Sequence, residues 1–145
     1  MTWVVDACAA ASLFLPDEDG SVLRSILVGL EDGDRILVPA LWWYEMTNVL
    51  VGSIRRGRLE EAAAFHALEM LRRLNPSRDA RPLEESAPAA FVLARAHGLS
   101  SYDAAYLELA AREGGTLCSF GGALRSAANK AGIPLKPTAV EPTAA

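Results

Sequence analysis

The chain has 145 residues, of which 51% are hydrophobic and 22% charged, and its formal net charge is −4. This composition is typical of a single folded domain with a substantial core, and it excludes a disordered chain. The negative charge excludes broad electrostatic attraction to nucleic acid and leaves local basic patches as the possible contacts.

The cysteines and the amino terminus indicate the compartment. Cys8 and Cys118 are too few for a disulfide framework, and neither has a Cys or His partner at zinc-site spacing. No uninterrupted apolar stretch is long enough to span a bilayer, and Asp6 interrupts any secretory pattern at once. We therefore expect a cytoplasmic protein with no membrane partner.

Short apolar strands alternate with amphipathic helices along the chain. The first half predicts a strand at 3–5, a helix at 7–15, a helix at 21–30, a strand at 36–38, and helices at 41–56 and 59–73. The second half predicts a loop at 75–79, a helix at 86–97 with Pro88 in its first turn, a helix at 101–113, a strand at 116–119, a helix at 123–131 and a last strand within 135–140.

This alternation predicts an α/β fold, with a parallel sheet covered by helices on both faces. We expect residues 1–140 to form one domain and residues 141–145 a flexible tail. Ligands of such sheets bind outside the carboxyl ends of the strands. Asp6 follows the first predicted strand and so lies at one of these ends.

Three carboxylates stand in apolar sequence, where a charged group is costly. Asp6 ends the first strand, Glu45 lies on the helix at 41–56, and Asp103 lies on the helix at 101–113. An unpaired ionised carboxylate is unfavourable in the interior, so such groups are normally paired, protonated or bound to a metal. No Lys or Arg is next to any of them in sequence. Together they suggest a divalent-cation site.

Each acid also has a purely structural interpretation. Asp6 is a favoured N-cap residue for the helix that follows it. Asp103 comes three residues after Ser100, which is a loose capping-box pattern. Glu45 has the weakest structural explanation, as a half-exposed residue at the edge of an apolar stripe. These alternatives remain open at the level of sequence.

Helical spacing distinguishes two sides of the helix at 101–113. Asp103 shares one face with Leu107 and Ala110, whereas Glu108 and Arg112 point the other way. We therefore expect Asp103 on the inward side of this helix, a position that a simple cap does not require.

The order of the three acids resembles that of the PIN-domain nucleases, and within them the VapC-type toxins of bacterial toxin–antitoxin pairs. The matching segments are the strand before Asp6, a helix that carries Glu45 after a Val-Pro pair, and the run at 99–106 that contains Asp103. This last run is the most specific, and the resemblance extends over residues 3–133.

The resemblance implies a three-layer α/β/α sandwich with a short central parallel sheet that hydrolyses RNA with Mg²⁺ or Mn²⁺. By matched position, Asp6, Glu45 and Asp103 would be the metal-site acids, and Ser119 would hydrogen-bond a ligand or a water. Carboxylate oxygens suit these hard cations. The implied partners are an RNA substrate, a VapB-like antitoxin and a second copy of the chain in a homodimer.

Two positions depart from the family pattern. Cys8 stands where the family usually carries Ser or Thr, and Gly121 stands where it has a fourth acid, although Ser119 keeps the hydroxyl position. The loss of this acid leaves two interpretations. The protein is either a ribonuclease with weakened activity, or a PIN domain that acts mainly as an antitoxin-binding module.

A different class of protein also places an Asp at the end of a strand. Receiver-like and phosphatase-like domains use it as phosphoacceptor or nucleophile, usually with a second acid two residues later or a suitably placed Lys. Here that second position is Cys8, and lysine occurs only at positions 130 and 136. The sequence therefore disfavours this class.

Two further features concern the partners. Arginines 55, 56 and 58 form one cluster and arginines 72, 73, 78 and 81 another, either as contacts for an RNA backbone or as solvated polar surface. Trp42 and Trp43, near a helix start, indicate an apolar groove for an antitoxin segment, with the alternative that at least one of them belongs to the core.

Overall fold

Five short parallel strands form the centre of the fold. In the computed structural model, which describes residues 1–138, these strands are β1 (Thr2–Val5), β2 (Arg35–Val38), β3 (Ser77–Arg78), β4 (Thr116–Cys118) and β5 (Leu135–Lys136). Their order across the sheet is β3-β2-β1-β4-β5, and every neighbouring pair is parallel. β1 is therefore central, and the carboxyl ends of all the strands lie at one edge.

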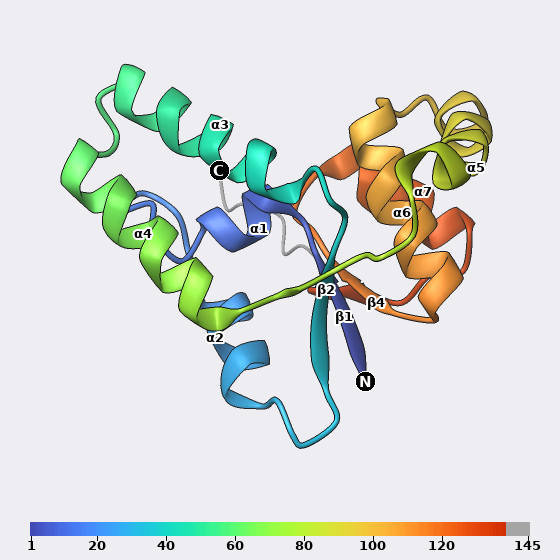
Figure 1. Cartoon of the computed structure of the whole chain (residues 1–145), viewed down its shortest axis with the longest axis horizontal. Coiled ribbons are helices and arrows are strands. Elements are labelled where there is room, and N and C mark those ends of the chain that lie inside the picture. The colour runs from blue at the N-terminus through green and yellow to red at the C-terminus, as the bar shows by residue number, and fades with distance from the viewer. Residues whose placement is uncertain (139–145) are drawn as a thin grey trace.

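Helices cover this sheet on both sides. They are α1 (Ala7–Ala11), α2 (Ser21–Val28), α3 (Trp42–Arg55), α4 (Glu61–Leu74), α5 (Leu83–His97), α6 (Ser101–Glu113) and α7 (Gly122–Lys130). In Figure 1, α1 to α4 lie on one side of the strands and α5 to α7 on the other. The predicted three-layer α/β/α sandwich with a parallel sheet is confirmed.

No helix within residues 1–138 is long and apolar enough to cross a membrane.

Near the carboxyl terminus, the predicted last strand is observed at Leu135–Lys136. Residues 139–140 of that prediction, and the predicted tail at 141–145, lie outside the described residues.

The central strands are buried on both faces because their sequences are continuous apolar runs. Val4 and Val5 of β1 and Leu117 of β4 are at most 2% exposed. Such runs, rather than alternating patterns, are typical of parallel strands covered by helices. Both faces of the sheet therefore belong to one core.

Two helices differ from their predicted limits by three residues or more, and the other differences are one or two residues. The first helix ends at Ala11 rather than at residue 15, and residues 12–14 continue as turns. Ser12 donates its hydroxyl to the carbonyl of Ala9 at 2.6 Å, a local bond of the kind that competes with regular helix. Helix α5 begins three residues early, at Leu83, so Pro88 lies in its second turn and not in its first, on an exposed part of the helix.

The prediction of a continuous loop at residues 75–79 is wrong. Ser77 and Arg78 form β3, which pairs with Leu37 and Val38 of β2. Both residues of β3 are exposed, so no apolar pattern marks this edge strand in the sequence. Asp79 continues the contact by donating its backbone N–H to the carbonyl of Val38 at 2.8 Å. Backbone pairing with β2, rather than side-chain burial, defines this strand.

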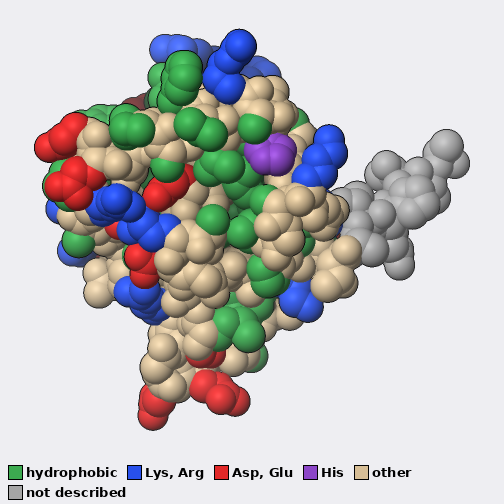
Figure 2. Space-filling view, turned by 90° about the vertical axis from the view of Figure 1, so that its right-hand side faces the viewer, with side chains coloured by type: hydrophobic (Ala, Val, Ile, Leu, Met, Phe, Trp, Pro, Cys, Tyr) green, Lys and Arg blue, Asp and Glu red, His purple; other side chains and the backbone are tan. Residues whose placement is uncertain are grey.

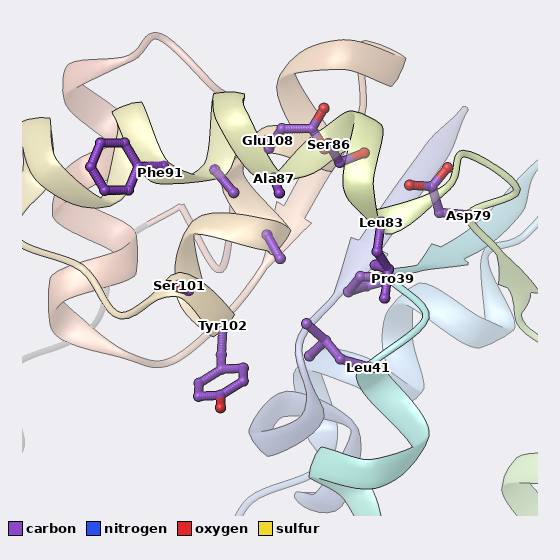
Figure 3. A pocket seen from close by; sticks show the side chains of 12 residues that line it. Pro39, Leu41, Asp79, Leu83, Ser86, Ala87, Phe91, Ser101, Tyr102 and Glu108 are labelled. Atoms are coloured by element: carbon purple, nitrogen blue, oxygen red, sulfur yellow. The ribbon is translucent and has the colours of Figure 1, made fainter.

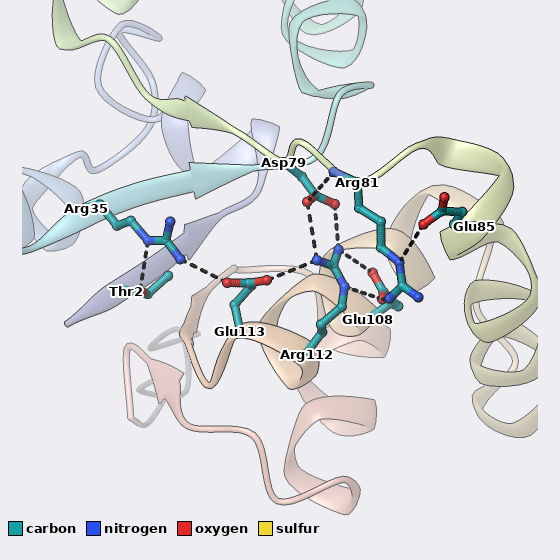
Figure 4. A network of polar contacts seen from close by, with 8 residues as sticks. All are labelled: Thr2, Arg35, Asp79, Arg81, Glu85, Glu108, Arg112 and Glu113. Carbon is teal, nitrogen blue, oxygen red and sulfur yellow. Dashed lines mark hydrogen bonds and ion pairs between the residues drawn. The ribbon is translucent and has the colours of Figure 1, made fainter.

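The far side of α6 is not the solvent side that helical spacing suggested. Glu108 is only 6% exposed, and Arg112 donates to it at 2.8 Å and to Asp79 at 2.6 Å (Figure 4). Burial acts to raise the pKa of Asp79, but the hydrogen bonds from Arg112 hold that pKa below its usual value. The network joins α6 to the chain that follows β3.

The tryptophan pair belongs to the packing of α3. Trp42 is 1% exposed, and Trp43 is partly buried against the core. Their rings are 4.9 Å apart and nearly perpendicular, an edge-to-face arrangement that aromatic pairs favour. The interpretation of Trp42 as a core residue is confirmed, so this side chain does not line an open groove.

Candidate active site

Asp6 lies at the carboxyl end of the central strand, between β1 and the end of β4. Its backbone N–H donates to the carbonyl of Cys118 at 3.1 Å. Its carboxylate caps α1 by accepting the N–H of Ala9 at 2.7 Å, and the residue is 8% exposed. The structural interpretation of Asp6 as an N-cap is therefore correct, but the cap also holds this carboxylate at the ligand-binding edge of the sheet.

The carboxylate of Asp6 is buried without a cationic partner. Burial raises its pKa, hydrogen bonds from Ser119 and the backbone lower it, and the charge of Asp103 raises it again, so that the net shift is upward. Within residues 1–138, none of the ion pairs involves Asp6. A bound cation would stabilise the ionised form that the present surroundings disfavour.

Glu45 comes to the same edge from the first turn of α3. It is half-buried, and its Oε1 accepts a hydrogen bond from the hydroxyl of Tyr106 at 2.7 Å. Burial raises the pKa of Glu45, this hydrogen bond lowers it, and the charges of Asp103 and Asp6 raise it further. Because the charges of these acids affect one another's pKa values, the three carboxylates lie close enough to interact electrostatically.

Asp103 is the third acid, at the start of α6. Its backbone N–H donates to the hydroxyl of Ser100 at 3.1 Å, which confirms the capping pattern. The side chain itself is half-buried, and burial raises its pKa. The cap therefore uses the backbone of Asp103 and leaves its carboxylate available at the site.

The three acids do not form a closed coordination set. In the described part of the chain, no group of three Asp, Glu, His or Cys side chains is arranged to hold a metal ion as it stands. The donors are nevertheless hard oxygens that carry like charges near each other, which is the donor chemistry that Mg²⁺ and Mn²⁺ require. By donor type and charge, Asp6, Glu45 and Asp103 fit a divalent cation.

Ser119 lies beside Asp6 in the turn after β4. It is completely buried, its side chain lies close enough to the carboxylate of Asp6 to lower the pKa of that acid, and its Oγ accepts the N–H of Gly121 at 3.2 Å. Buried Arg125 fixes this turn by donating to the carbonyl of Ser119 at 2.8 Å and to that of Pro137 at 2.6 Å. The serine hydroxyl is thus held beside the first acid.

Gly121 has an ordinary extended backbone, with φ −70° and ψ 122°. A Cβ atom at this position would meet only the hydroxyl of Ser119, at a normal contact distance of 3.7 Å. Neither backbone strain nor a close approach requires glycine here. A side chain at residue 121 would begin beside the serine that binds Asp6.

Two more side chains lie near the acids: Tyr106, which had no role in the sequence analysis, and Cys8, which was noted there as a departure from the family pattern. Tyr106 is 1% exposed, and burial followed by the charge of Glu45 raises the pKa of its hydroxyl, which keeps it protonated as a donor. Burial and the neighbouring acids raise the pKa of the Cys8 thiol to about 11, so the thiol is neutral. The only sequence signal for Tyr106 was its position one helical turn after Asp103.

The apolar pocket in Figure 3 is a separate feature. Its volume is about 400 Å³, and its walls come from the segment after β2, from α5 and from α6, with Leu41, Phe91 and Tyr102 among them. None of the three acids of the site lines it. Its chemistry suits apolar groups, so it is not the centre at which hydrolysis would occur.

Comparison with known proteins agrees with this geometry. The sequence model of the PIN domain matches residues 3–130. Ribonuclease VapC3 of Pyrobaculum aerophilum is 35% identical over 117 residues, which cover 81% of this chain and 87% of that protein. The chain therefore belongs to the PIN-domain family, and within it to the VapC type.

Solved structures show the same fold. The protein PAE2754 of Pyrobaculum aerophilum superposes with a TM-score of 0.67 at 25% identity, over 93% of this chain and 83% of that one. VapBC2 of Rickettsia felis, solved with a DNA fragment from its promoter, has a TM-score of 0.65 at 14% identity, over 94% of this chain and 98% of that one.

The Tyr106→Phe variant tests how the site controls Glu45. Loss of the hydroxyl removes the one hydrogen bond that lowers the pKa of Glu45, so this pKa should rise. The fold should lose about 1 kcal/mol of stability, as for a typical hydrogen bond. Carbon NMR of labelled glutamate carboxyls, recorded over a pH series, measures the first effect.

The matched control is Tyr44→Phe, because Tyr44 lies on α3 next to Glu45 but is 82% exposed. This variant should leave the titration of Glu45 as in the parent protein. Equal titration curves for the parent and Tyr106→Phe would contradict the role of the Tyr106 hydroxyl.

Proposed function

We propose that this protein is a metal-dependent endoribonuclease, the toxin of a VapBC-type toxin–antitoxin pair. The observation that carries the proposal is a group of three carboxylates at the carboxyl edge of the sheet that have raised pKa values and, within residues 1–138, no cationic partner. Perturbed acids of this kind cluster at functional sites. The 35% identity to a ribonuclease, Ribonuclease VapC3, supports RNA as the substrate class.

The residues of the site divide the work of phosphodiester hydrolysis. Asp6, Glu45 and Asp103 would hold Mg²⁺ or Mn²⁺, which supplies an activated water and neutralises charge on the phosphate. Tyr106 orients Glu45 by occupying one of its oxygens, which leaves the other free. Ser119 lowers the pKa of Asp6 and so favours the ionised form of that carboxylate. No side chain is needed as a nucleophile.

Gly121 supports reduced activity. With glycine at this position, the site has one negative charge fewer than the family pattern provides, which weakens its attraction for a divalent cation. This is the observation behind the second candidate function, a PIN domain that mainly binds an antitoxin. We favour a weakened nuclease, because Asp6, Glu45, Asp103 and the hydroxyl of Ser119 are all retained at the site.

Substitution of the acids tests the nuclease function. In Asp6→Asn and Asp103→Asn, Mn²⁺ affinity and RNA cleavage should both fall by more than about tenfold, since even outer-shell changes cost about 10–100-fold. Asn also caps helices well, so Asp6→Asn should fold. Calorimetry with Mn²⁺ and cleavage of a labelled RNA are the two measurements, and Asp32→Asn, in an exposed loop, is the control.

Mn²⁺ binding by the parent protein, measured by calorimetry, should also depend on pH. The cation binds the ionised carboxylates, and burial raises the pKa values of all three acids. Mn²⁺ affinity should therefore be constant above these raised values and fall as the pH decreases through them. The fall should start at a higher pH than for ordinary carboxylates.

The metal site would be refuted if Asp6→Asn and Asp103→Asn both bound Mn²⁺ as tightly as the parent protein.

The Gly121→Asp variant should raise both Mn²⁺ affinity and RNA cleavage. The backbone at residue 121 accepts a side chain without strain, and Asp is a favoured N-cap for α7, whose cap position Gly121 occupies. Thermal melting should show unchanged or slightly increased stability. Calorimetry and cleavage assays measure the gain.

Gly122→Asp is the matched control for this gain of function. It adds the same charge one residue later, at the first position of α7, where a Cβ has no neighbour within 4 Å. A gain in Gly121→Asp alone supports a ligand position at residue 121. Equal effects of both variants would mean that only the general charge matters, and no gain in either would show that residue 121 does not face the ion.

We infer that the partners are a VapB-like antitoxin and a second copy of this chain. Exposed apolar side chains gather on the face formed by α5 to α7 (Figure 2), among them Leu83, Phe91, Val92 and Tyr102, each 58–66% exposed. Patches of this kind usually mark contacts with partner chains. Sedimentation of the purified protein should give a dimer, and co-expression with the antitoxin should give a larger complex; a stable solitary monomer in both experiments would contradict the inference.

A further inference from the structure

Ion pairs within the described residues engage some, but not all, of the arginines in the two clusters. In the first cluster, Arg58 donates to Asp17 at 2.8 Å and to Glu18 at 3.3 Å. In the second cluster, ion pairs to carboxylates engage Arg72, Arg73 and Arg81. Across residues 1–138, no such pair involves Arg55, Arg56 or Arg78. The charge of Arg56 is therefore available for an anionic ligand.

Arg56 lines a polar cavity of about 400 Å³ between α1 and α3. Cys8, Asn48, Gly52 and Arg58 are among the other residues of its walls. Its neighbour in the sequence, Arg55, is not one of them. The cavity thus combines a guanidinium and an amide, which are the donors that a phosphate group accepts from.

One face of α3 connects this cavity to the acids. Glu45, Asn48, Gly52 and Arg56 recur at helical spacing along it. A Cβ on Gly52 would lie 3.5 Å from both terminal nitrogens of Arg56, so the guanidinium folds back over Gly52, toward Glu45. The seven residues from Glu45 to Gly52 span about 10 Å of helix, so the guanidinium would reach a phosphate beside the one at the acids.

Cys8 marks the place where the cavity meets the site. It lines the cavity, and it lies only two residues after Asp6. The one acid in the cavity wall, Glu18, is engaged by Arg58. An RNA strand that leaves the acids by this route passes Cys8 and then reaches the guanidinium of Arg56.

We propose that this cavity is a subsite for an RNA phosphate next to the cleaved one, bound by Arg56 and hydrogen-bonded by Asn48. The proposal rests on the proposed ribonuclease function. It reconciles the net charge of −4 with an anionic substrate, because one locally available cation receives the strand beside the acidic centre. Since every nucleotide carries a phosphate, the subsite contributes affinity and register rather than sequence preference.

The test compares Arg56→Gln with Arg55→Gln, which removes the same charge from the same end of α3 outside the cavity. Anisotropy of a short fluorescein-labelled single-stranded RNA, without divalent ions, gives the affinity over a salt series. Arg56→Gln should bind about threefold to tenfold more weakly and lower the salt slope by about 0.7, as for one lost phosphate contact. Arg55→Gln should change the affinity less than about twofold, and melting curves should show both variants folded.

Each outcome decides a separate point. Equal effects of the two variants overturn the subsite, including the case in which the cavity receives an antitoxin side chain instead of RNA. The expected binding pattern in a protein that cleaves no RNA with Mn²⁺ supports the subsite and contradicts the nuclease function. Cleavage by Arg56→Gln with the parent's KM supports the nuclease function and overturns the subsite.

Discussion

Helix α6 is packed on nearly every side, and the arrangement of the acidic site depends on that packing. It contacts β1 and β4 of the sheet and the neighbouring helices α5 and α7. Its far side is held by Arg112, which binds Glu108 and Asp79 together. These bonds set the rotation of the helix, and that rotation turns Asp103 and Tyr106 toward Asp6 and Glu45. A helix with one solvated side would not be held in this orientation so firmly.

The carboxylates of this protein fall into two electrostatic classes. Asp79 is paired with Arg112, and its pKa lies below the usual value, so its ionised form stabilises the fold. Asp6, Glu45 and Asp103 have raised pKa values, so their ionised forms oppose folding. Acids that destabilise the fold in this way are explained by function, since a cation or a substrate can compensate them only when it binds.

The departures at Cys8 and Gly121 act in the same direction. A neutral thiol and a glycine replace a hydroxyl and a carboxylate, so the site is less polar and less negative than the family pattern. An ion held by fewer protein ligands takes more of its contacts from substrate phosphate and water. Affinity for the RNA strand then matters more, and a cationic contact beside the acids, such as Arg56, gains importance.

The sequence by itself determined the class of fold and singled out the three acids that are proposed for the site. Continuous apolar strands and amphipathic helices predict the covered parallel sheet, and Asp6, Glu45 and Asp103 are recognisable because each stands in apolar surroundings. Burial of hydrophobic side chains is a property that local composition reports directly, so these elements could be predicted. The helix limits at Ala11 and Leu83 were missed because local hydrogen bonds, not burial, decide them.

Only the tertiary structure decided which polar groups meet. β3 is defined by backbone pairing with β2, and its exposed residues carry no pattern that a sequence could reveal. The burial of Glu108 could not be read from the sequence, because its partner Arg112 also binds Asp79, which lies 33 positions from Arg112 in the segment after β3. The bond from Tyr106 to Glu45, across 61 residues, and the separation of Arg56 from the paired arginines have the same cause. Hydrogen bonds and ion pairs depend on distances of a few ångströms between segments remote in the chain, and only the packed fold sets those distances.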